Sequence, residues 1–251
     1  MALNSIIAFI ELEMRRLRTN RMELYTRVVQ PILWLALFGP IISQTRAIEI
    51  PGVNYESFIM PGILIQSIVF VSIFYGLTII WESESGILKK LLTIPISRES
   101  IIIGRSSASI ARALFQMAII IPVSYLVGVR VDLNPLFILL SIFIVFLTSM
   151  GFSSLSIFIA SFMRTRERFM GLGQAITLPL FFASNALYPI NVMPPIIREI
   201  ASFNPLSYSV DSLRDLLILG NFNILNDVIF LLLFNFACIF LASIRFNKIA
   251  E

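Results

Sequence analysis

Long apolar stretches separated by short charged segments dominate this chain. Six stretches are long enough to cross a bilayer, whose hydrocarbon core takes about 20 apolar residues per helix: residues 28–45, 58–80, 107–128, 136–162, 170–190 and 226–245. The pattern predicts an all-α integral membrane protein with six transmembrane helices. Five would remain if 28–45, the shortest stretch, lay only at the membrane interface.

Composition points to the same class of protein. Of the 251 residues, 57% are hydrophobic and only 14% are charged, so the remainder cannot supply a water-soluble surface. The sequence contains no His, and its single Cys238 lies in an apolar stretch. Metal sites and Cys/His catalysis are therefore not expected, and Cys238 is interpreted as a small buried apolar residue.

The positions of Lys and Arg predict the orientation. They are concentrated in residues 1–27, 81–105, 163–169 and 245–251, and they are sparse in the intervening connections. Cytoplasmic loops of membrane proteins carry the excess of Lys and Arg. Both termini and 81–105 are therefore expected in the cytosol, with 1–27 forming an interfacial helix whose Arg side chains reach lipid headgroups.

Arg112 is the one basic residue expected inside a span. We expect it to extend toward the cytosolic interface near Arg105, with a charge in the substrate path as the alternative. Basic and aromatic residues form no pattern typical of nucleic-acid binding. Membrane lipids are the expected surroundings.

The charged insert 81–105 interrupts the apolar pattern. Ile87, Leu88, Leu91 and Leu92 share one helical face and Pro95 ends the segment, which predicts a short amphipathic helix. A solvated surface helix accounts for this pattern equally well. The chain has no Gly-x-x-x-x-Gly-Lys motif, so it cannot hold nucleotide phosphates in a P-loop, and any ATP that drives it must be hydrolysed by another chain.

Motifs along most of the chain resemble permeases of the ABC type-2 export family, which includes daunorubicin-type, capsule, O-antigen and lipo-oligosaccharide exporters. The first is Glu82-x-x-x-Gly86-x-Leu88-x-x-Leu91-x-x-x-Pro95-Ile96-Ser97-Arg98, followed by Ile103-Gly104-Arg105. The others are Ala160-Ser161-Phe162, the 164–167 turn, the stretch LPLFFASNALYP at 178–189, Pro194, and Asn204-Pro205-Leu206-Ser207-Tyr208-x-x-Asp211-x-Leu213-Arg214. Where relatives often have Gly after Ser184, this chain has Asn185, whose amide needs a partner in the membrane.

The resemblance implies a single transmembrane domain over 1–251 in the cell membrane. Two copies of the permease would pair and two cytosolic ATPase subunits would dock beneath them. ATP and Mg would bind to those subunits, and this chain would hold no cofactor, no metal and no catalytic residues. The resemblance also implies that a coupling helix contacts the ATPase, with Glu82, Glu84, Gly86, Leu88, Leu91 and Pro95 as the matching positions.

The connection 189–225 is long but apolar, so it is not expected to stand in water. Prolines and Asn204-Pro205 predict two helices, at 196–203 and 207–219, and in the family such a re-entrant pair gates the outward exit. The gate candidates are Asn204, Pro205, Asp211 and Arg214. Asp211 and Arg214 are three residues apart and can form an ion pair.

Pathway residues of the family lie mainly on the second and fifth spans. The candidates are Gln66, Phe70, Phe74, Gln174, Phe181 and Phe182. Walls rich in Phe favour a lipid-like or drug-like cargo, and a polysaccharide or glycolipid exporter of the same family is the alternative. A secondary transporter that works without ATP is disfavoured because no span has a carboxylate near its centre. An intramembrane enzyme or a membrane-bound scaffold is disfavoured because the sequence offers neither a catalytic constellation nor a soluble interaction domain.

Overall fold

The computed structural model describes residues 11, 15, 19, 21–45, 53–86, 98–163 and 165–245. The helices in the first half are α2 (Arg21–Leu33), the π-helical turn η1 (Trp34–Phe38), α3 (Gly39–Thr45), α4 (Tyr55–Phe74), α5 (Gly76–Glu84) and α7 (Arg98–Leu126). Those in the second half are α8 (Pro135–Ala160), α9 (Arg166–Phe182), η2 (Ile190–Val192), α10 (Pro195–Ser202), α11 (Pro205–Arg214), η3 (Asp215–Leu219) and α12 (Leu225–Arg245). The predicted all-α class is confirmed for the described residues.

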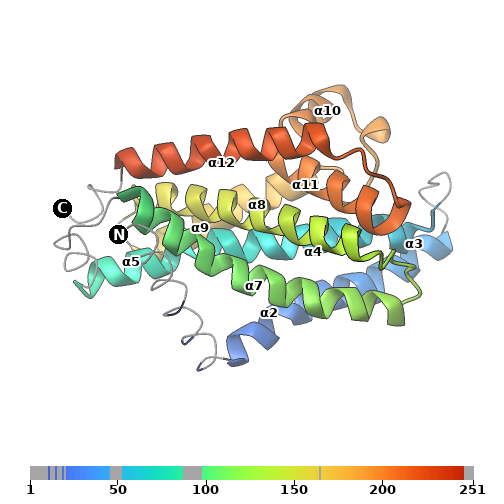
Figure 1. Ribbon diagram of the computed structural model, residues 1–251, viewed down its shortest axis with the longest axis horizontal. Coiled ribbons are helices and arrows are strands. Elements are labelled where there is room, and N and C mark those ends of the chain that lie inside the picture. The colour runs from blue at the N-terminus through green and yellow to red at the C-terminus, as the bar shows by residue number, and fades with distance from the viewer. Residues whose placement is uncertain are drawn as a thin grey trace.

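The long helices lie side by side along the long axis of the molecule (Figure 1). The central helices are α4 and α8: α8 packs against α12, α7 and α4, and α4 also packs against α9 and α11. Almost every side chain of α4 is buried, from Tyr55 to Phe74, as expected of a helix that is apolar on all faces. Helix α12 instead exposes a row of large apolar side chains, including Leu233 and Phe236.

The two ends of the bundle differ. The C-terminal ends of α5 and α12 and the start of α7 lie at one end, and α3, α10 and α11 lie at the other (Figure 1). After the roles predicted for the segments 81–105 and 189–225, we call these the coupling end and the outer end. The positions of Lys and Arg predict that the two segments lie on opposite sides of the membrane, and their described parts do lie at opposite ends.

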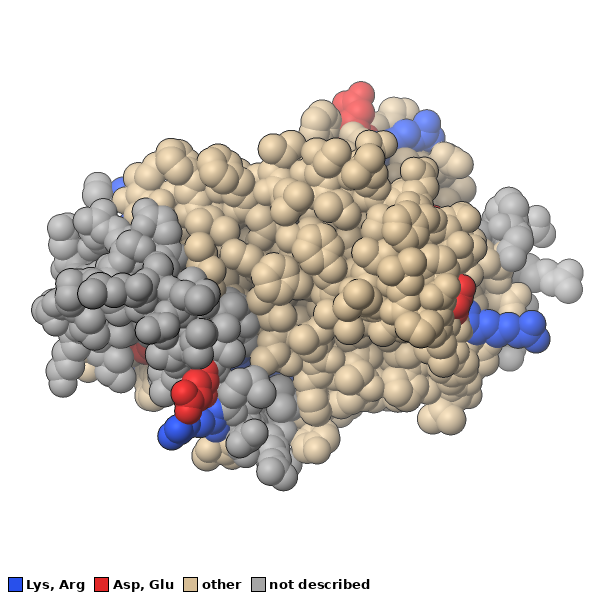
Figure 2. Space-filling view, in the orientation of Figure 1, with Lys and Arg blue, Asp and Glu red and all other residues tan. Residues whose placement is uncertain are grey.

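Five helices in the described part of the chain are long and apolar enough to span a membrane: Tyr25–Ser43, Tyr55–Glu84, Ile101–Leu126, Pro135–Ala160 and Leu225–Arg245. They match five of the six predicted spans, and the 28–45 stretch is among them. On the face shown in Figure 2, no charged residue appears across the middle of the bundle. An uncharged belt of this kind is compatible with contact to lipid tails.

The remaining predicted span, 170–190, is shorter than expected. Helix α9 has 17 residues and ends at Phe182, well before residue 190. Side chains satisfy its terminal carbonyls: the Asn204 amide donates to the oxygens of Leu180 at 2.6 Å and Ala183 at 2.9 Å, and the Ser184 hydroxyl donates to that of Phe181. These contacts replace the next helical turn.

Buried serines join the central helices. Ser72 of α4 and Ser109 of α7 both hydrogen-bond to the Ser149 hydroxyl of α8, at 3.0 and 2.7 Å. Further along α8, the Ser156 hydroxyl donates to the Ile73 carbonyl and accepts from the Gly76 amide at 2.9 Å. A side chain inserted in this way interrupts the helical hydrogen-bond ladder, which explains why α4 and α5 are separate helices.

Candidate functional site

The coupling end of the bundle is formed by the last turn of α5. Gly86 follows this helix with a φ of +73°, and its amide donates to the Ser83 carbonyl at 3.1 Å. The position just after a helix often adopts the left-handed conformation, and Gly is the residue most often found there. Gly86 therefore ends α5 with a turn. The other predicted coupling positions Leu88, Leu91 and Pro95 lie outside the described residues.

The two acidic coupling candidates have different environments. Glu82 is 0% exposed, whereas Glu84 is exposed and forms an ion pair with Arg166, whose Nε donates to a Glu84 carboxylate oxygen at 2.9 Å. Arg166 is the first residue of α9. Glu84 therefore links α5 to α9, whereas the Glu82 side chain is buried.

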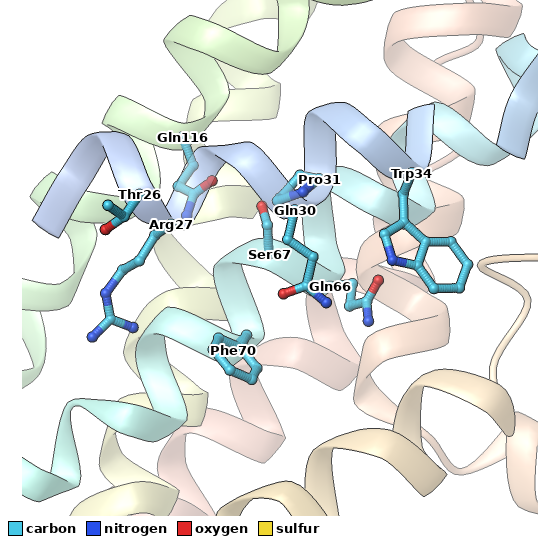
Figure 3. A pocket seen from close by; sticks show the side chains of 9 residues that line it. All are labelled: Thr26, Arg27, Gln30, Pro31, Trp34, Gln66, Ser67, Phe70 and Gln116. Atoms are coloured by element: carbon cyan, nitrogen blue, oxygen red, sulfur yellow. The ribbon is translucent and has the colours of Figure 1, made fainter. Parts of the chain in front are cut away.

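Two cavities lie along α4. The first, about 190 Å³ in volume, is lined by residues of α2, η1, α4 and α7: Thr26, Arg27, Gln30, Pro31, Trp34, Gln66, Ser67, Phe70 and Gln116 (Figure 3). The second, about 340 Å³, is lined by Arg27, Val71, Phe74, Tyr75, Leu77, Thr78, Trp81, Arg112, Arg166 and Met170. Arg27 lines both, so we call the pair the α2–α4 groove.

The pathway candidates separate into three groups. Gln66 and Phe70 line the first cavity and Phe74 lines the second. Phe181 is 1% exposed and packs edge-on against Trp34, with ring centroids 6.2 Å apart. Gln174 and Phe182 lie on the exposed surface of α9, outside both cavities. The structure therefore gathers the candidates of α4 and not those of α9.

Sequence reasoning missed the contribution of the first span to the groove. Thr26, Arg27, Gln30 and Trp34 were assigned only to an interfacial or spanning helix. Gln30 lies within an apolar stretch one turn from Thr26 and from Trp34, and this spacing places the three residues on one helical face. A search for polar residues shared by neighbouring spans would have found the combination of Gln30 with Gln66.

The outer end holds an ion pair in which Arg214 is buried and Asp211 is partly exposed. Arg214 Nη1 donates to Asp211 at 2.9 Å, and Nη2 donates to the Asn185 carbonyl at 2.8 Å and to that of Phe58 at 3.3 Å. The guanidinium carbon also lies 3.8 Å from the centroid of the Phe58 ring. The predicted pairing of Asp211 with Arg214 is confirmed, and it ties α11 both to α4 and to the segment after α9.

Burial shifts the titration of this cluster. It lowers the pKa of Arg214 to about 10, although Asp211 opposes the shift, so the guanidinium remains charged at neutral pH. Burial raises the pKa of Asp211, which the charge of Arg214 and a hydrogen bond from Asn185 partly offset. Burial and the neighbouring Asp211 also raise the pKa of Asp215. The Asn185 side chain thus has one partner in Asp211, whereas its side-chain oxygen accepts no hydrogen bond from the described residues.

The remaining gate candidates organise the helix start. Asn204 is the N-cap of α11, where its side-chain oxygen accepts from the Leu206 amide at 3.0 Å and Pro205 occupies the first turn. The same side chain holds the end of α9 through its amide. Helices α10 and α11 begin at Pro195 and Pro205, within two residues of the predicted starts.

This arrangement defines a multi-pass membrane protein with a polar groove between its spans and no sequence motif for nucleotide binding. The chain belongs to the ABC-2 type transporter family, whose profile matches residues 4–218. This confirms the resemblance found in its motifs.

Several relatives carry permease names. The ycf38 transport permease of Porphyra purpurea is 32% identical over 189 residues, which cover 74% of this chain and 65% of that protein. The daunorubicin resistance permease DrrB1 of Streptomyces coeruleorubidus is 25% identical, covering 78% and 68%. The inner membrane transport permease YadH of Escherichia coli is 24% identical, covering 84% and 83%. A transport permease role follows from this similarity.

Proposed function

We propose that this chain is the membrane-spanning subunit of an ATP-driven exporter, which moves an amphipathic cargo outward by coupling to a separate ATPase subunit. The observation that carries the proposal is the Gly86 turn, which ends the second span within the family motif that begins at Glu82, in a chain without a P-loop. The ATPase subunit would hold ATP and Mg. Two copies of each subunit would form the complex in the plasma membrane.

The contacts of α9 supply a route for the coupling. At the coupling end, Arg166 joins α9 to Glu84 of α5; at the outer end, Asn204 holds the carbonyls of Leu180 and Ala183. A displacement of the segment after α5 would therefore be passed along a rigid helix to α11. Motion of packed elements as rigid bodies is a common form of such transmission.

The same proposal assigns the two ends to the two sides of the membrane. The coupling end and both termini face the cytosol, and α10 and α11 form the external re-entrant gate. Helix α10 supports this role because it exposes Ile196, Ile200 and Phe203, side chains that favour a lipid interface over water. Asp211 and Arg214 fix the inner side of the gate.

The test is reconstitution with the cognate ATPase subunit. The purified chain alone should hydrolyse no ATP, and co-expression should give a four-chain complex that does. The variant Gly86→Ala should lower transport per ATP hydrolysed, whereas Gly128→Ala, a second Gly at positive φ in the loop after α7, serves as the matched control. Transport by the chain alone in ATP-free proteoliposomes would contradict the proposal and favour a secondary transporter.

A second candidate, a glycolipid or polysaccharide exporter, is favoured by one observation. The first cavity is lined by three Gln side chains and Ser67, which suit a hydroxylated cargo better than a purely apolar one. The two candidates differ in the cargo that stimulates the ATPase activity of the complex.

A further inference from the structure

The second predicted span is interrupted at one point. Helix α4 ends at Phe74 and α5 begins at Gly76, and α5 continues from α4 toward the coupling end (Figure 1). At the interruption the backbone bonds reach back three residues instead of four: the Tyr75 amide donates to the Ser72 carbonyl at 3.3 Å, and the Thr78 amide donates to the Tyr75 carbonyl at 3.0 Å. A short stretch of this tighter pattern inside a long helix often marks a hinge.

A side chain from a neighbouring helix fills the interruption. Ser156 of α8 is 0% exposed, and its hydroxyl donates to the Ile73 carbonyl and accepts from the Gly76 amide at 2.9 Å. Both backbone groups are therefore satisfied although the helical ladder does not continue between them, as a lipid environment requires. A hydroxyl rotates to suit its partners, so these two bonds tolerate a change of angle between α4 and α5 better than a continuous ladder does.

Helix α5 is attached to α9 at both of its ends. A Cβ atom at Gly76 would meet the Ser156 hydroxyl and the Phe169 ring of α9, so the absence of a side chain lets α8 and α9 approach this point of the span. At the other end of α5, Glu84 forms its ion pair with Arg166. Both contacts involve the first turn of α9, which is therefore expected to move with α5.

The second cavity lies across the interruption. Its volume is about 340 Å³, and its wall includes Val71 and Phe74 of α4 and Leu77, Thr78 and Trp81 of α5. A turn of α5 against α4 therefore changes the width of this cavity. The first cavity is different, because the residues of α4 that line it all precede the interruption.

We propose that the second span is hinged at Tyr75 and Gly76, with Ser156 as the pivot, and that motion of α5 about this hinge opens and closes the second cavity. Helix α5 has nine residues, which corresponds to a length of about 14 Å. A bend of about 20°, the size of a helix kink, moves the end of such a helix by about 5 Å. The use of this motion in a transport cycle rests on the proposed function, whereas the hinge itself does not.

The hinge is tested on the full-length chain in nanodiscs by measuring distances between spin labels. Cys238→Ala removes the native thiol. Labels at Val29→Cys on α2 and Ser85→Cys just after α5, both exposed positions, form the cavity pair, which measures the separation of two walls of the second cavity. Labels at Val29→Cys and Ile244→Cys, at the end of α12, form the reference pair, which includes no residue of α5. The distance distribution should be broader for the cavity pair.

Ser156→Ala removes the pivot, so the Gly76 amide returns to the Ser72 carbonyl and the span becomes one continuous helix. The distribution of the cavity pair should then narrow and its mean should shift by up to about 5 Å, whereas the reference pair should not change. Ser154→Ala is the matched control. It removes another buried hydroxyl of α8, which pairs with the Ser106 hydroxyl at 3.0 Å, and it should alter neither pair.

Two results would overturn the proposal. One is the same cavity-pair distribution with and without the Ser156 hydroxyl, and the other is an equal change in both pairs, which would show that whole helices move. Hydrogen exchange of the native protein decides the matter even if Ser156→Ala fails to fold. The amides of residues 75–78 should exchange about tenfold faster than those of residues 63–69 in α4, because a hinge opens locally. Equal protection of the two segments would mean that the span has no hinge.

A second arm places the cavity pair in the complex of this chain with its cognate ATPase. Trapping the complex with ATP and orthovanadate should shift the mean distance of the cavity pair and leave the reference pair unchanged. An unshifted cavity pair in a complex that exports cargo would overturn the proposal that the hinge works in transport. A complex that neither hydrolyses ATP nor exports cargo would count against the proposed function, and the comparison in the chain alone would still decide whether the hinge exists.

Discussion

The two ends of the bundle each carry an Arg–carboxylate pair, and the Arg side chain is much more buried at the outer end than at the coupling end. At the outer end, the side chains of Arg214 and Asp211 are 10% and 42% exposed; at the coupling end, those of Arg166 and Glu84 are 45% and 41% exposed. Arg214 also bonds to two backbone carbonyls and stacks on Phe58, whereas Arg166 bonds only to Glu84 among the contacts described for it.

The difference implies different mechanical roles. Exposed ion pairs contribute about 0–1 kcal/mol, so the Arg166–Glu84 link can break and re-form during a transport cycle at little cost. Arg214 is 10% exposed and also bonds to two backbone carbonyls, so opening its pair with Asp211 leaves a largely buried guanidinium charge without its partner. The outer end is therefore a fixed joint and the coupling end an adjustable one.

The strongest test of the fixed joint is Arg214→Met. It leaves Asp211 without its partner and the carbonyls of Phe58 and Asn185 without a donor. We expect a loss of about 1–3 kcal/mol of stability, the range for leaving buried polar groups without a partner, measured as a drop in the apparent unfolding temperature in detergent. The stability of the matched variant Arg166→Met should be lower than that of the native protein by less than about 1 kcal/mol. Similar losses in the two variants would refute the distinction.

Gly62→Ala tests how tightly the outer end is packed. A Cβ at Gly62 would contact the backbone of Ala186, with 2.7 Å to its Cα, so the segment after α9 must shift. Overpacking of this kind is unfavourable by about 1–3 kcal/mol. Thermal unfolding checks the loss, and Gly171→Ala, which meets nothing within 4 Å on α9, is the control. An unchanged unfolding temperature would show that the segment after α9 can shift without a loss of stability.

Gly86→Ala is the counterpart at the coupling end. A Cβ there has open space, so the only penalty is the left-handed backbone, about 1 kcal/mol. Stability should fall slightly, whereas transport per ATP should fall much further because the turn directs the coupling segment. Gly86→Asn, which tolerates the same φ, should recover most of the activity. A proportional loss of stability and transport would argue against a coupling role.

Breaking the exposed ion pair between Glu84 and Arg166 should have only a small effect on stability. Glu84→Gln removes the charge of one partner of an exposed ion pair. The free energy of unfolding should therefore stay within about 1 kcal/mol of that of the native protein. The rate of stimulated ATP hydrolysis should change if α5 drives α9 through this contact. The double variant Glu84→Gln with Arg166→Gln should then equal either single variant; additive effects would show that the two residues act separately.

Much of this fold was predictable because lipid forces a simple pattern. Twenty apolar residues specify a span, and Asn204-Pro205 specifies a helix start, so five spans and the starts of α10 and α11 match the sequence. The end of α9 was not predictable. It depends on Asn204, 22 residues after the helix ends, reaching back to the Leu180 carbonyl, and apolar residues continue past Phe182 in the sequence.

The site was predicted only in part for a related reason. The pairing of Asp211 with Arg214 is local, three residues apart, and so was visible in the sequence. The α2–α4 groove joins Gln30, Gln66 and Gln116 from three helices, and no local spacing reveals which faces meet. Phe181 shows a similar limit, because the sequence does not reveal that this aromatic residue of α9 is buried in the core.

The smallest effect concerns pH at the outer end. The pKa of Asp215 is raised in the folded protein above its usual value near 3.8, so between that value and the raised one the folded state binds more protons than the unfolded state. Stability from this residue therefore increases as pH falls through that window. Asp215→Asn should remove this contribution, so the difference in unfolding temperature between native protein and variant should move in favour of the native protein as the buffer is taken from neutral pH toward pH 4. A difference that moves in favour of the variant would mean that Asp215 is stabilised in its charged form, and the outer end would then be a less fixed joint than the burial of Arg214 indicates.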